Sequence, residues 1–387
     1  MVIGGVDLKE TEARSGVYVN QGAGVKAFIP KPLPPKIHYD SGLRNLLSEA
    51  DTSLAAFNGL TTYLPNSKMF IYIFIRKEAL LSSQIEGTQA TMKGFLEYEN
   101  NIKNYENPDD IEEVANYVKA MNYGIERLKK FPMSLRLFKE IHRILLQGTR
   151  GNAKEPGEFR RTQNWIGPAN SSISTATFVP PPPNLVIEKL GELESFIYED
   201  DNIPYLIKAA LIHAQFQTIH PFLDGNGRLG RLLITFFLYW KGRLNNPVLY
   251  MSYFFKQHKS EYYEHLMDIR NRGLWEKWIQ FFLKGVIESS ETGLNIAKQI
   301  IDLQKKYETS FDKNPKAHKN SYRFLKILFD HPYMTVKQVQ DLFDITYTPA
   351  QNLIKQFVDM GVLSELKEKS TKTKVYSFRE YLELIVR

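Results

Sequence analysis

The chain has 387 residues and no cysteine, with 43% hydrophobic and 13% aromatic residues, which indicates a globular protein of two or three domains and excludes disordered and disulfide-stabilised classes. Its net charge of +7, from 50 basic and 43 acidic side chains, permits contact with phosphates but does not require a nucleic-acid partner. No apolar run is long enough to span a membrane and the first residues carry no secretion pattern, so we expect a cytoplasmic protein with no membrane partner.

The first half of the chain predicts an extended arm followed by helices. Residues 1–45 are rich in Gly and Pro, and we expect them to lie extended on the rest of the molecule. The helical pattern from 46 to 98 includes one helix that ends at IEG (85–87), where Gly87 suits the left-handed position after a helix. Further helices are expected over 110–130 and 135–148.

The middle of the chain first has a composition typical of loops and then a pattern typical of helices. Residues 149–184 are dominated by Gly, Pro, Asn and Ser, with a β-like TATFV (175–179) before four prolines. They are expected to form loops and a short hairpin. Helices are expected to follow at 185–199, 203–219, 228–241 and through 258–308.

The C-terminal part is expected to form a separate unit after a linker at 312–320. Three helices are expected at 321–330, 336–343 and 348–361, then two strands around a basic turn within 362–378. Three helices followed by a charged hairpin are typical of a winged helix-turn-helix domain. Two uses are open: DNA binding, with contacts from Gln351, Asn352 and Lys355, or protein contact, including a homodimer.

The stretch HPFLDGNGRLGR (220–231) concentrates residues suited to chemistry on a phosphate. Gly225, Asn226 and Gly227 precede a helix expected to begin near Arg228, where unpaired N–H groups and the helix dipole favour an anion. Arg228 and Arg231 are three residues apart on the first turn, so both guanidinium groups are expected to reach a polyphosphate.

Two other residues of this stretch fit catalysis. His220 ends the preceding helix, on the face that also carries His213 and Gln217, and is the candidate general base for an incoming hydroxyl. Asp224 is a candidate ligand for Mg²⁺ that bridges phosphate oxygens. The chain contains no GxxxxGK[ST] and no HExxH motif.

The whole string resembles the signature HxFx(D/E)GNGRxxR of the Fic (Fido) family. Similar surroundings are EPGEFRRTQNWIG (155–167), TFVPPPP (177–183) and VLYMSYFFKQHKSEYY (248–263), so the resemblance covers roughly 45–290. It implies an all-helical core with a short β-hairpin flap that transfers AMP from ATP to a protein hydroxyl.

The resemblance also assigns roles to individual residues. His220 is the implied base, Asp224 holds Mg²⁺, and Phe222 packs the loop. The segment 177–183 is the implied flap, which aligns the target protein by strand addition. The implied nucleotide-binding residues are Gln217, Gly225, Asn226, Gly227, Arg228, Leu229, Gly230, Arg231 and Tyr263.

A second resemblance concerns SSQIEG (82–87), which is similar to the family's inhibitory-helix pattern (S/T)xxxE(G/N) through Ser82, Glu86 and Gly87. In that arrangement Glu86 pairs with Arg231. Because Arg231 cannot serve both this carboxylate and the γ-phosphate of ATP, the nucleotide is held in an unproductive pose.

Together these features predict a mainly α protein with three parts. They are an N-terminal region with the inhibitory helix (1–110), a Fic core (111–290), and a connecting helix with a winged-helix domain (291–387). The expected function is autoinhibited, Mg²⁺-dependent AMP transfer to a Ser, Thr or Tyr of a target protein or of the enzyme itself. The alternatives are a nucleotide-sensing transcriptional regulator, or a Fic-type enzyme that removes AMP or transfers another phosphate-linked group.

Overall fold

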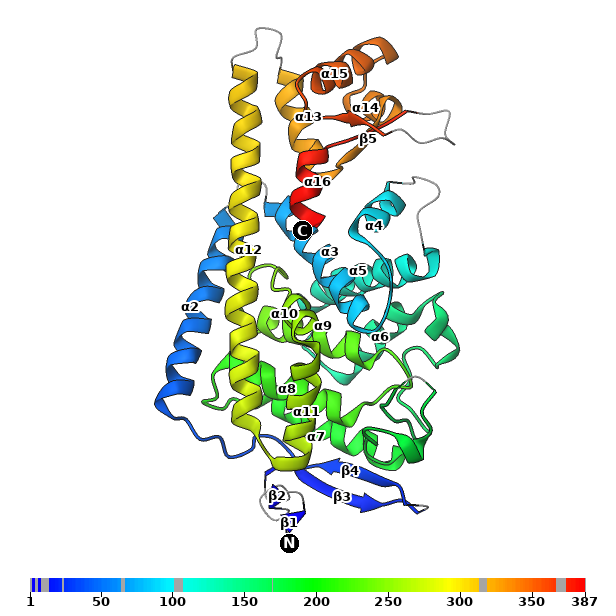
Figure 1. Ribbon diagram of the computed structural model, residues 1–387, viewed down its shortest axis with the longest axis vertical. Helices are drawn as coiled ribbons and strands as arrows, with labels where there is room; N and C mark the ends of the chain where they lie inside the picture. The colour runs from blue at the N-terminus through cyan, green and yellow to red at the C-terminus, as the bar shows by residue number, and fades with distance from the viewer. Residues whose placement is uncertain are drawn as a thin grey trace.

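The computed structural model describes residues 2–3, 6–7, 14–22, 24–63, 67–100, 107–168, 170–312, 319–366 and 374–386. These residues are mainly helical, and their strands form only small antiparallel sheets. The expected mainly α fold is confirmed. One continuous hydrophobic core runs through most of the length of the elongated molecule (Figure 1).

Two adjacent helices form the centre of this core, α8 (Tyr205–Ile219) and α9 (Asn226–Trp240). Every residue of α8 after Tyr205 is buried, so this helix has no polar face. A Cβ at Gly124 of α5 would lie 2.3 Å from the ring of Phe236, so glycine lets α5 approach α9 closely. The surrounding helices are α5 (Pro108–Leu128), α6 (Leu135–Leu146), α7 (Val186–Tyr198), α10 (Met251–Gln257) and α11 (Lys259–Arg272).

Two long helices lie side by side along one edge of the molecule (Figure 1), α12 (Trp275–Asp312) and α2 (Ser41–Tyr63). The 38 residues of α12 span roughly 57 Å at about 1.5 Å per residue. The helical stretch expected over 258–308 divides into α11 and α12 at Gly273, which adopts φ +67°. Since α12 continues through residue 290, the predicted domain boundary at that residue falls inside a helix.

The segment that carries the predicted inhibitory glutamate follows α3 (Ser67–Ile85). This helix ends where the sequence predicts, and Gly87 adopts φ +104°, a backbone conformation that favours glycine. After a short turn, α4 (Met92–Glu99) begins with Thr91 as its N-cap, whose hydroxyl accepts the Gly94 N–H.

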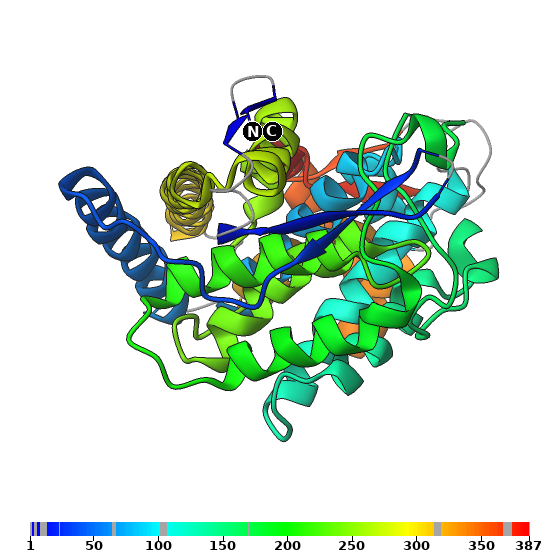
Figure 2. The same ribbon diagram turned by 90° about the horizontal axis from the view of Figure 1, so that it is seen from below.

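The N-terminal arm contains strands that the sequence analysis did not predict. The hairpin of β3 (Gly16–Asn20) and β4 (Lys26–Pro30) lies across the helices, as Figure 2 shows from below. The short strands β1 (Val2–Ile3) and β2 (Val6–Asp7) precede it. At TATFV the described pairing is limited to one isolated antiparallel bridge, in which Phe178 and Ile166 exchange both backbone hydrogen bonds. Short 3-10 helices lie nearby at η1 (Arg150–Ala153), η2 (Ile173–Thr175) and η3 (Pro183–Leu185).

The C-terminal unit contains the predicted helices and strands together with two elements that were not predicted. The predicted ones are α13 (Lys319–Asp330), α14 (Val336–Phe343), α15 (Tyr347–Asp359), β6 (Ser364–Glu365) and β7 (Val375–Ser377). The added ones are β5 (Tyr333–Thr335), which pairs with β7, and α16 (Arg379–Val386). The winged-helix interpretation stays a prediction, and most of the expected linker and basic turn lies outside the described residues.

This C-terminal unit packs directly on the helices that precede the core. Its helices α13 and α16 contact α3 and α4 (Figure 1). Side chains from both sides line one small apolar gap, among them Tyr72 and Met92 from the N-terminal side and Phe329 and Tyr381 from the C-terminal side. The helix leading to Glu86 is therefore in contact with the C-terminal unit at its other end.

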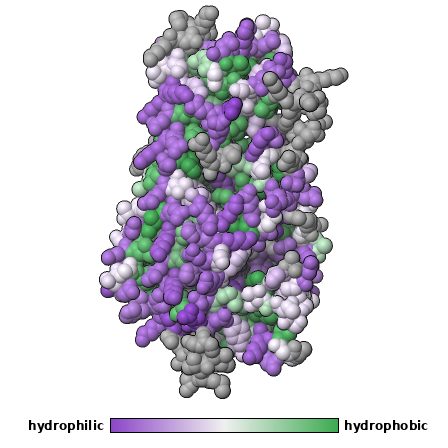
Figure 3. Space-filling view, in the orientation of Figure 1, coloured by the Kyte–Doolittle hydropathy of each residue, from purple (hydrophilic) through white to green (hydrophobic). Residues whose placement is uncertain are grey.

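The face of the molecule seen in Figure 3 is mostly hydrophilic, with scattered hydrophobic patches. This distribution agrees with the extensive burial of apolar side chains in the core. Within the described ranges, no helix combines the length and apolar character that a membrane-spanning segment needs.

Candidate functional site

The stretch 220–231 forms a tight loop between α8 and α9. His220 follows the last residue of α8 in a left-handed conformation, φ +48° and ψ 61°, which is uncommon for a residue other than glycine and recurs at functional sites. Gly225, with φ +73°, is the N-cap of α9, which begins at Asn226, two residues earlier than the predicted start. The backbone thus turns sharply twice within six residues, and the imidazole and the new helix end face the same space.

Side-chain hydrogen bonds hold this loop in place. Asn226 accepts the Phe222 N–H at 2.9 Å and donates to the Phe222 carbonyl at 2.8 Å. His142 of α6 contacts the Asp224 carbonyl through Nε2 at 2.9 Å, accepts the Gly157 N–H at Nδ1 at 2.8 Å, and stacks on the Phe222 ring at 3.7 Å between centroids. Since a carbonyl only accepts, Nε2 of His142 carries the proton, and burial lowers the pKa of this histidine to about 4.

A cavity of about 570 Å³ opens directly over this loop. The first turn of α9 and the side chains of His220 and Asp224 face it, and its far wall includes Thr177 and Phe178 of the predicted flap. The other lining residues include Glu86, Trp165, Gln217, Arg231, Lys259, Tyr263 and Arg270. A cavity that joins unpaired helix N–H groups, an imidazole and a guanidinium is suited to an anionic ligand with a nearby reacting group.

His220 is held as a neutral imidazole. Burial lowers the pKa of His220, and the positive charges of Arg270 and Arg160 lower it further. The contact with the Gln217 carbonyl and the charge of Glu86 act in the opposite direction but are weaker, so the pKa falls to about 3. Its Nδ1 lies 3.4 Å from the Gln217 carbonyl, which can only accept, so Nδ1 carries the proton and the lone pair is on Nε2. This tautomer can accept a proton from a ligand.

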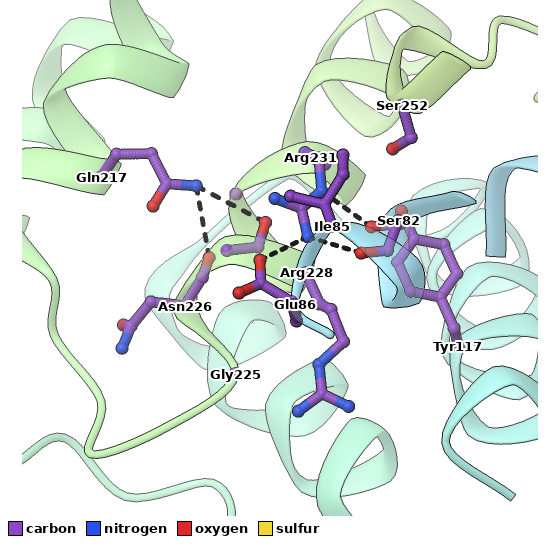
Figure 4. A network of polar contacts seen from close by, with 12 residues as sticks. Ser82, Ile85, Glu86, Tyr117, Gln217, Gly225, Asn226, Arg228, Arg231 and Ser252 are labelled. Atoms are coloured by element: carbon purple, nitrogen blue, oxygen red, sulfur yellow. Dashed lines mark hydrogen bonds and ion pairs between the residues drawn. The ribbon is translucent and has the colours of Figure 1, made fainter. Parts of the chain in front are cut away.

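Arg231 is the centre of a polar network beneath the cavity (Figure 4). Its Nη2 donates to Glu86 Oε1 at 2.6 Å and to the Ser82 carbonyl at 2.9 Å, and its Nε donates to Ser82 Oγ at 2.8 Å. The side chain of Arg231 is 1% exposed and that of Glu86 is 35% exposed. The predicted contact between Glu86 and Arg231 is therefore present, and the carboxylate still faces the cavity.

The electrostatics of this pair favour both charges. Burial alone would raise the pKa of Glu86, but the charge and hydrogen bond of Arg231 outweigh it and hold the pKa below its usual range. A Cβ at Gly227 would lie 2.0 Å from Glu86 Oε1, so the glycine of the loop also makes room for this carboxylate.

The other arginine of the stretch is paired with a buried carboxylate, and its nucleotide-binding role stays a prediction. The Nη1 of Arg228 donates to Glu113 Oε2 of α5 at 3.1 Å, and both side chains are less than a tenth exposed. Figure 4 shows its guanidinium directed away from Arg231, and Arg228 is not among the described residues that line the cavity. Three-residue spacing put both arginines on one turn, and Arg228 there lies between the buried Glu113 and Asp224, with its Nη2 3.9 Å from Asp224 Oδ1.

The remaining predicted residues divide between the cavity and its support. Gln217 and Tyr263 line the cavity, and Tyr263 is 40% exposed. Leu229 is fully buried and does not belong to the described lining. Gly230 is likewise not among the described lining residues, and its carbonyl accepts the Nδ1–H of His213 at 2.8 Å. His213 also accepts from the Tyr262 hydroxyl at 2.8 Å, so it supports α9 from below.

Asp224 provides the carboxylate that fits a divalent ion. Its side chain is 47% exposed at the cavity edge, and Oδ1 accepts the Gly225 N–H at 2.6 Å. Among the described residues, no group of three or more His, Cys, Asp or Glu side chains could hold a metal by itself. A divalent ion held by this one carboxylate would take most of its ligands from phosphate and water.

Sequence reasoning missed several residues around the site because they come from other elements. Glu113 and His142 lie on α5 and α6, far along the chain from the stretch they contact, and Arg270 of α11 contacts the end of α8 just before that stretch. Arg160 lies within EPGEFRRTQNWIG, which was noted for its resemblance but given no role. For none of these four residues do the neighbouring residues in the sequence indicate a functional role.

The comparisons with known proteins agree with this geometry. Residues 44–126 match the model of the Fic/DOC family N-terminal region, and residues 132–238 match that of the Fic/DOC family. A Fic family protein from Desulfovibrio desulfuricans G20, solved by crystallography, has a similar fold with a TM-score of 0.56 at 17% identity, covering 89% of this chain and 98% of that one.

Curated relatives are similar over shorter stretches. The protein adenylyltransferase Fic of Drosophila grimshawi is 31% identical over 176 residues, which are 45% of this chain and 33% of the relative. A probable protein adenylyltransferase of Aquifex aeolicus (strain VF5) is 39% identical over 73 residues, 19% of this chain and 23% of the relative. The chain spans a third or less of the length of these relatives.

Proposed function

Because this chain belongs to the Fic/DOC family, we propose that it transfers AMP from ATP to a hydroxyl group of a protein. One observation carries the proposal: the neutral imidazole of His220, the first turn of α9 and the carboxylate of Asp224 face one cavity of about 570 Å³. The relatives named as protein adenylyltransferases support the same reaction.

The chemistry follows from the protonation state of His220. Its Nε2 takes the proton of the acceptor hydroxyl as the oxygen attacks the α-phosphorus of ATP. The bond from the α-phosphorus to the bridging oxygen breaks, and pyrophosphate leaves. The N–H groups at the start of α9, from Asn226 and Gly227, stabilise the negative charge on the phosphates.

Asp224 is the residue that would hold Mg²⁺. A bound Mg²⁺ supplies positive charge to the phosphate oxygens. The contact of His142 with the Asp224 carbonyl fixes the backbone that carries this carboxylate. Arg228, which pairs with Glu113 and lies 3.9 Å from Asp224 Oδ1, stays a candidate contact for the phosphates.

We propose further that Glu86 inhibits the reaction by occupying Arg231. The 2.6 Å contact between Oε1 and Nη2 engages a donor of a guanidinium group that lines the cavity. A γ-phosphate placed there would find the Nη2 donor of Arg231 already occupied by Glu86. It would also be repelled by the Glu86 carboxylate, because Glu86 is held ionised. Release of Glu86 is then the step that activates the enzyme.

The target protein is proposed to bind along the segment 177–183, beside the cavity. Phe178 already uses its N–H and carbonyl on Ile166, and the Val179 carbonyl accepts the Phe28 N–H at 2.9 Å. A strand added to this segment would therefore pair through Thr177 or displace β4. Target selection would then depend on the N-terminal hairpin as well as on the flap.

One observation favours a second activity at the same site, removal of AMP from a modified protein. Glu86 is ionised, lines the cavity and keeps 35% of its side chain exposed, so it could orient a water for attack on a bound phosphodiester. DNA binding by the C-terminal unit remains a prediction: Gln351, Asn352 and Lys355 are exposed on α15.

The proposed activity is tested by incubating the Glu86→Gly variant with ATP, Mg²⁺ and a cell extract. Mass spectrometry should then find AMP joined through a phosphodiester to Ser, Thr or Tyr side chains. Finding phosphorylated side chains but no AMP adducts would reject the proposal. Loss of existing adducts in extracts treated with the native protein would identify the second activity.

A further inference from the structure

Two buried arginines without an acidic partner flank the end of the helix that carries His220. Arg160 is 2% exposed and Arg270 is 3% exposed. Within the described part of the chain, neither forms an ion pair with a carboxylate. Burial lowers the pKa of each to about 10. A buried charge without a counter-ion is costly unless its hydrogen bonds are well satisfied, so their partners indicate what these side chains do.

Arg160 joins the end of α8 to the flap. Its Nε donates to the His220 carbonyl at 2.9 Å, and its Nη2 donates to the Ile219 carbonyl at 3.3 Å and to the Pro181 carbonyl at 2.6 Å. Ile219 is the last residue of α8, whereas Pro181 lies in the segment 177–183. One guanidinium group thus spans both.

Arg270, from α11, also joins the end of α8 to the flap, through α8 residues that precede those bound by Arg160. Its Nη2 donates to the Gln217 carbonyl at 3.2 Å and its Nε donates to Thr218 Oγ1 at 3.1 Å. Its guanidinium lies 3.8 Å from the centre of the Phe178 ring, within cation–π range. Unlike Arg160, Arg270 also lines the cavity.

The helix end explains why positive charges belong there. The last carbonyls of an α-helix lack partners within the helix, and they carry the negative end of its dipole. Here the two guanidinium groups take up the carbonyls of Gln217, Ile219 and His220. Because the same groups hold Pro181 and the Phe178 ring, the base and the flap share their supports.

We propose that Arg270, together with Arg160, is a positioning residue that sets His220 relative to the flap, so that an acceptor hydroxyl held by the flap meets the imidazole. This inference rests on the proposed function, in which His220 is the base. The charges of Arg270 from α11 and Arg160 from the loop after α6 also disfavour protonation of His220, whereas Glu86 after α3 opposes them.

The test compares Arg270→Gln, Arg270→Lys and Arg272→Gln in the full chain, each combined with Glu86→Gly. Arg272 is the matched control: it lies on the same helix, is 47% exposed, and forms a 3.4 Å surface pair with Asp268. The measured quantities are the rate of transfer from α-labelled ATP at saturating ATP, the KM for ATP, and the melting temperature. The acceptor is a fixed amount of cell extract.

We expect Arg270→Gln to lower the saturated rate by about ten- to a hundredfold, as misplacement of a reacting group does, with a KM for ATP within about threefold of the parent. Arg270→Lys should recover part of the rate, because it keeps the charge and a donor. Arg272→Gln should match the parent. A folded Arg270→Gln variant with the parent rate, or one with only a raised KM, would overturn the proposal.

If Arg270→Gln does not fold, the variant Phe178→Leu tests the positioning proposal in its place. That variant keeps an apolar side chain but removes the aromatic face on which Arg270 rests. A lower saturated rate with unchanged KM for ATP supports the proposal, and an unchanged rate overturns it. His220→Ala is run alongside: full activity there means that the proposed function has failed, whereas its inactivity beside a fully active Arg270→Gln means that only this inference has failed.

Discussion

Replacement of Glu86 by glycine should activate the enzyme without disturbing the arginine that Glu86 contacts. Arg231 makes one hydrogen bond to Glu86 but two to Ser82, at 2.8 and 2.9 Å. The variant loses only the first, so the guanidinium stays anchored beneath the cavity with its outer side free. ATP can then place its γ-phosphate there, and the α-phosphate aligns with His220.

The size of the effect follows from the strength of the lost contact. A hydrogen bond between charged groups contributes about 1.5–3 kcal/mol. The 35% exposure of the Glu86 side chain favours the lower part of that range, because solvent screens the pair. We therefore expect the initial rate of AMP transfer to rise by about ten- to thirtyfold, since about 1.4 kcal/mol corresponds to a factor of ten.

The assay is the initial rate of label transfer from ATP labelled at its α-phosphate, at fixed protein and Mg²⁺. Glu86→Gln is the control for loosening of the chain, since it keeps the size of the side chain but loses its charge, and it should also activate. Glu261→Gln, at an exposed glutamate of α11, should leave the rate unchanged. Unchanged rates in both Glu86 variants would refute the inhibitory role.

In the activated background, His220→Ala should lower transfer by about 10²–10⁴-fold, the usual contribution of a general base, while calorimetry still detects ATP binding; an active variant would contradict the role of His220. Asp224→Ala and excess chelator should each abolish labelling, and labelling that survives chelation would exclude the metal. Because the pKa of His220 is lowered to about 3, the imidazole becomes protonated only in strong acid. Transfer should therefore fall less than about twofold from pH 7.5 to 5.5, where a histidine with its usual pKa of about 6.5 would lose about tenfold; a tenfold loss would show an unshifted base. A chain ending at Asp312 should still transfer AMP, since no described residue beyond it lines the cavity, and a folded but inactive truncation would contradict that independence.

The sequence predicted the parts of the site that lie close together along the chain. The loop at 220–231 needs glycine at its left-handed turn and an imidazole at a helix end, and both requirements are visible in twelve residues. The contact between Glu86 and Arg231 joins residues far apart in the chain, and it followed from the resemblance alone. The pairing of Arg228 with Glu113 was not predicted, because Glu113 lies on another helix that the local spacing does not reveal.

The two differences between the predicted and the observed strands have physical causes. The segment 16–30 has short runs of β-branched and aromatic residues (VYV and AFI) on both sides of a Gly-containing turn, a hairpin signal that the Pro-rich composition of the arm obscured. TATFV has residues typical of strands, but four prolines follow it directly. Since proline has no N–H to donate, backbone pairing is limited to the bridge at Phe178 and the bond from the Phe28 N–H to the Val179 carbonyl.

The most direct test of the central claim is which phosphate of ATP reaches the protein. The Glu86→Gly variant is incubated with a cell extract and either ATP labelled at the α-phosphate or ATP labelled at the γ-phosphate, and protein-bound label is measured. AMP transfer predicts labelled protein from the α-labelled nucleotide only, with the signal lost in the His220→Ala double variant. Label arriving from the γ-phosphate, or α-label that persists without His220, would contradict the account.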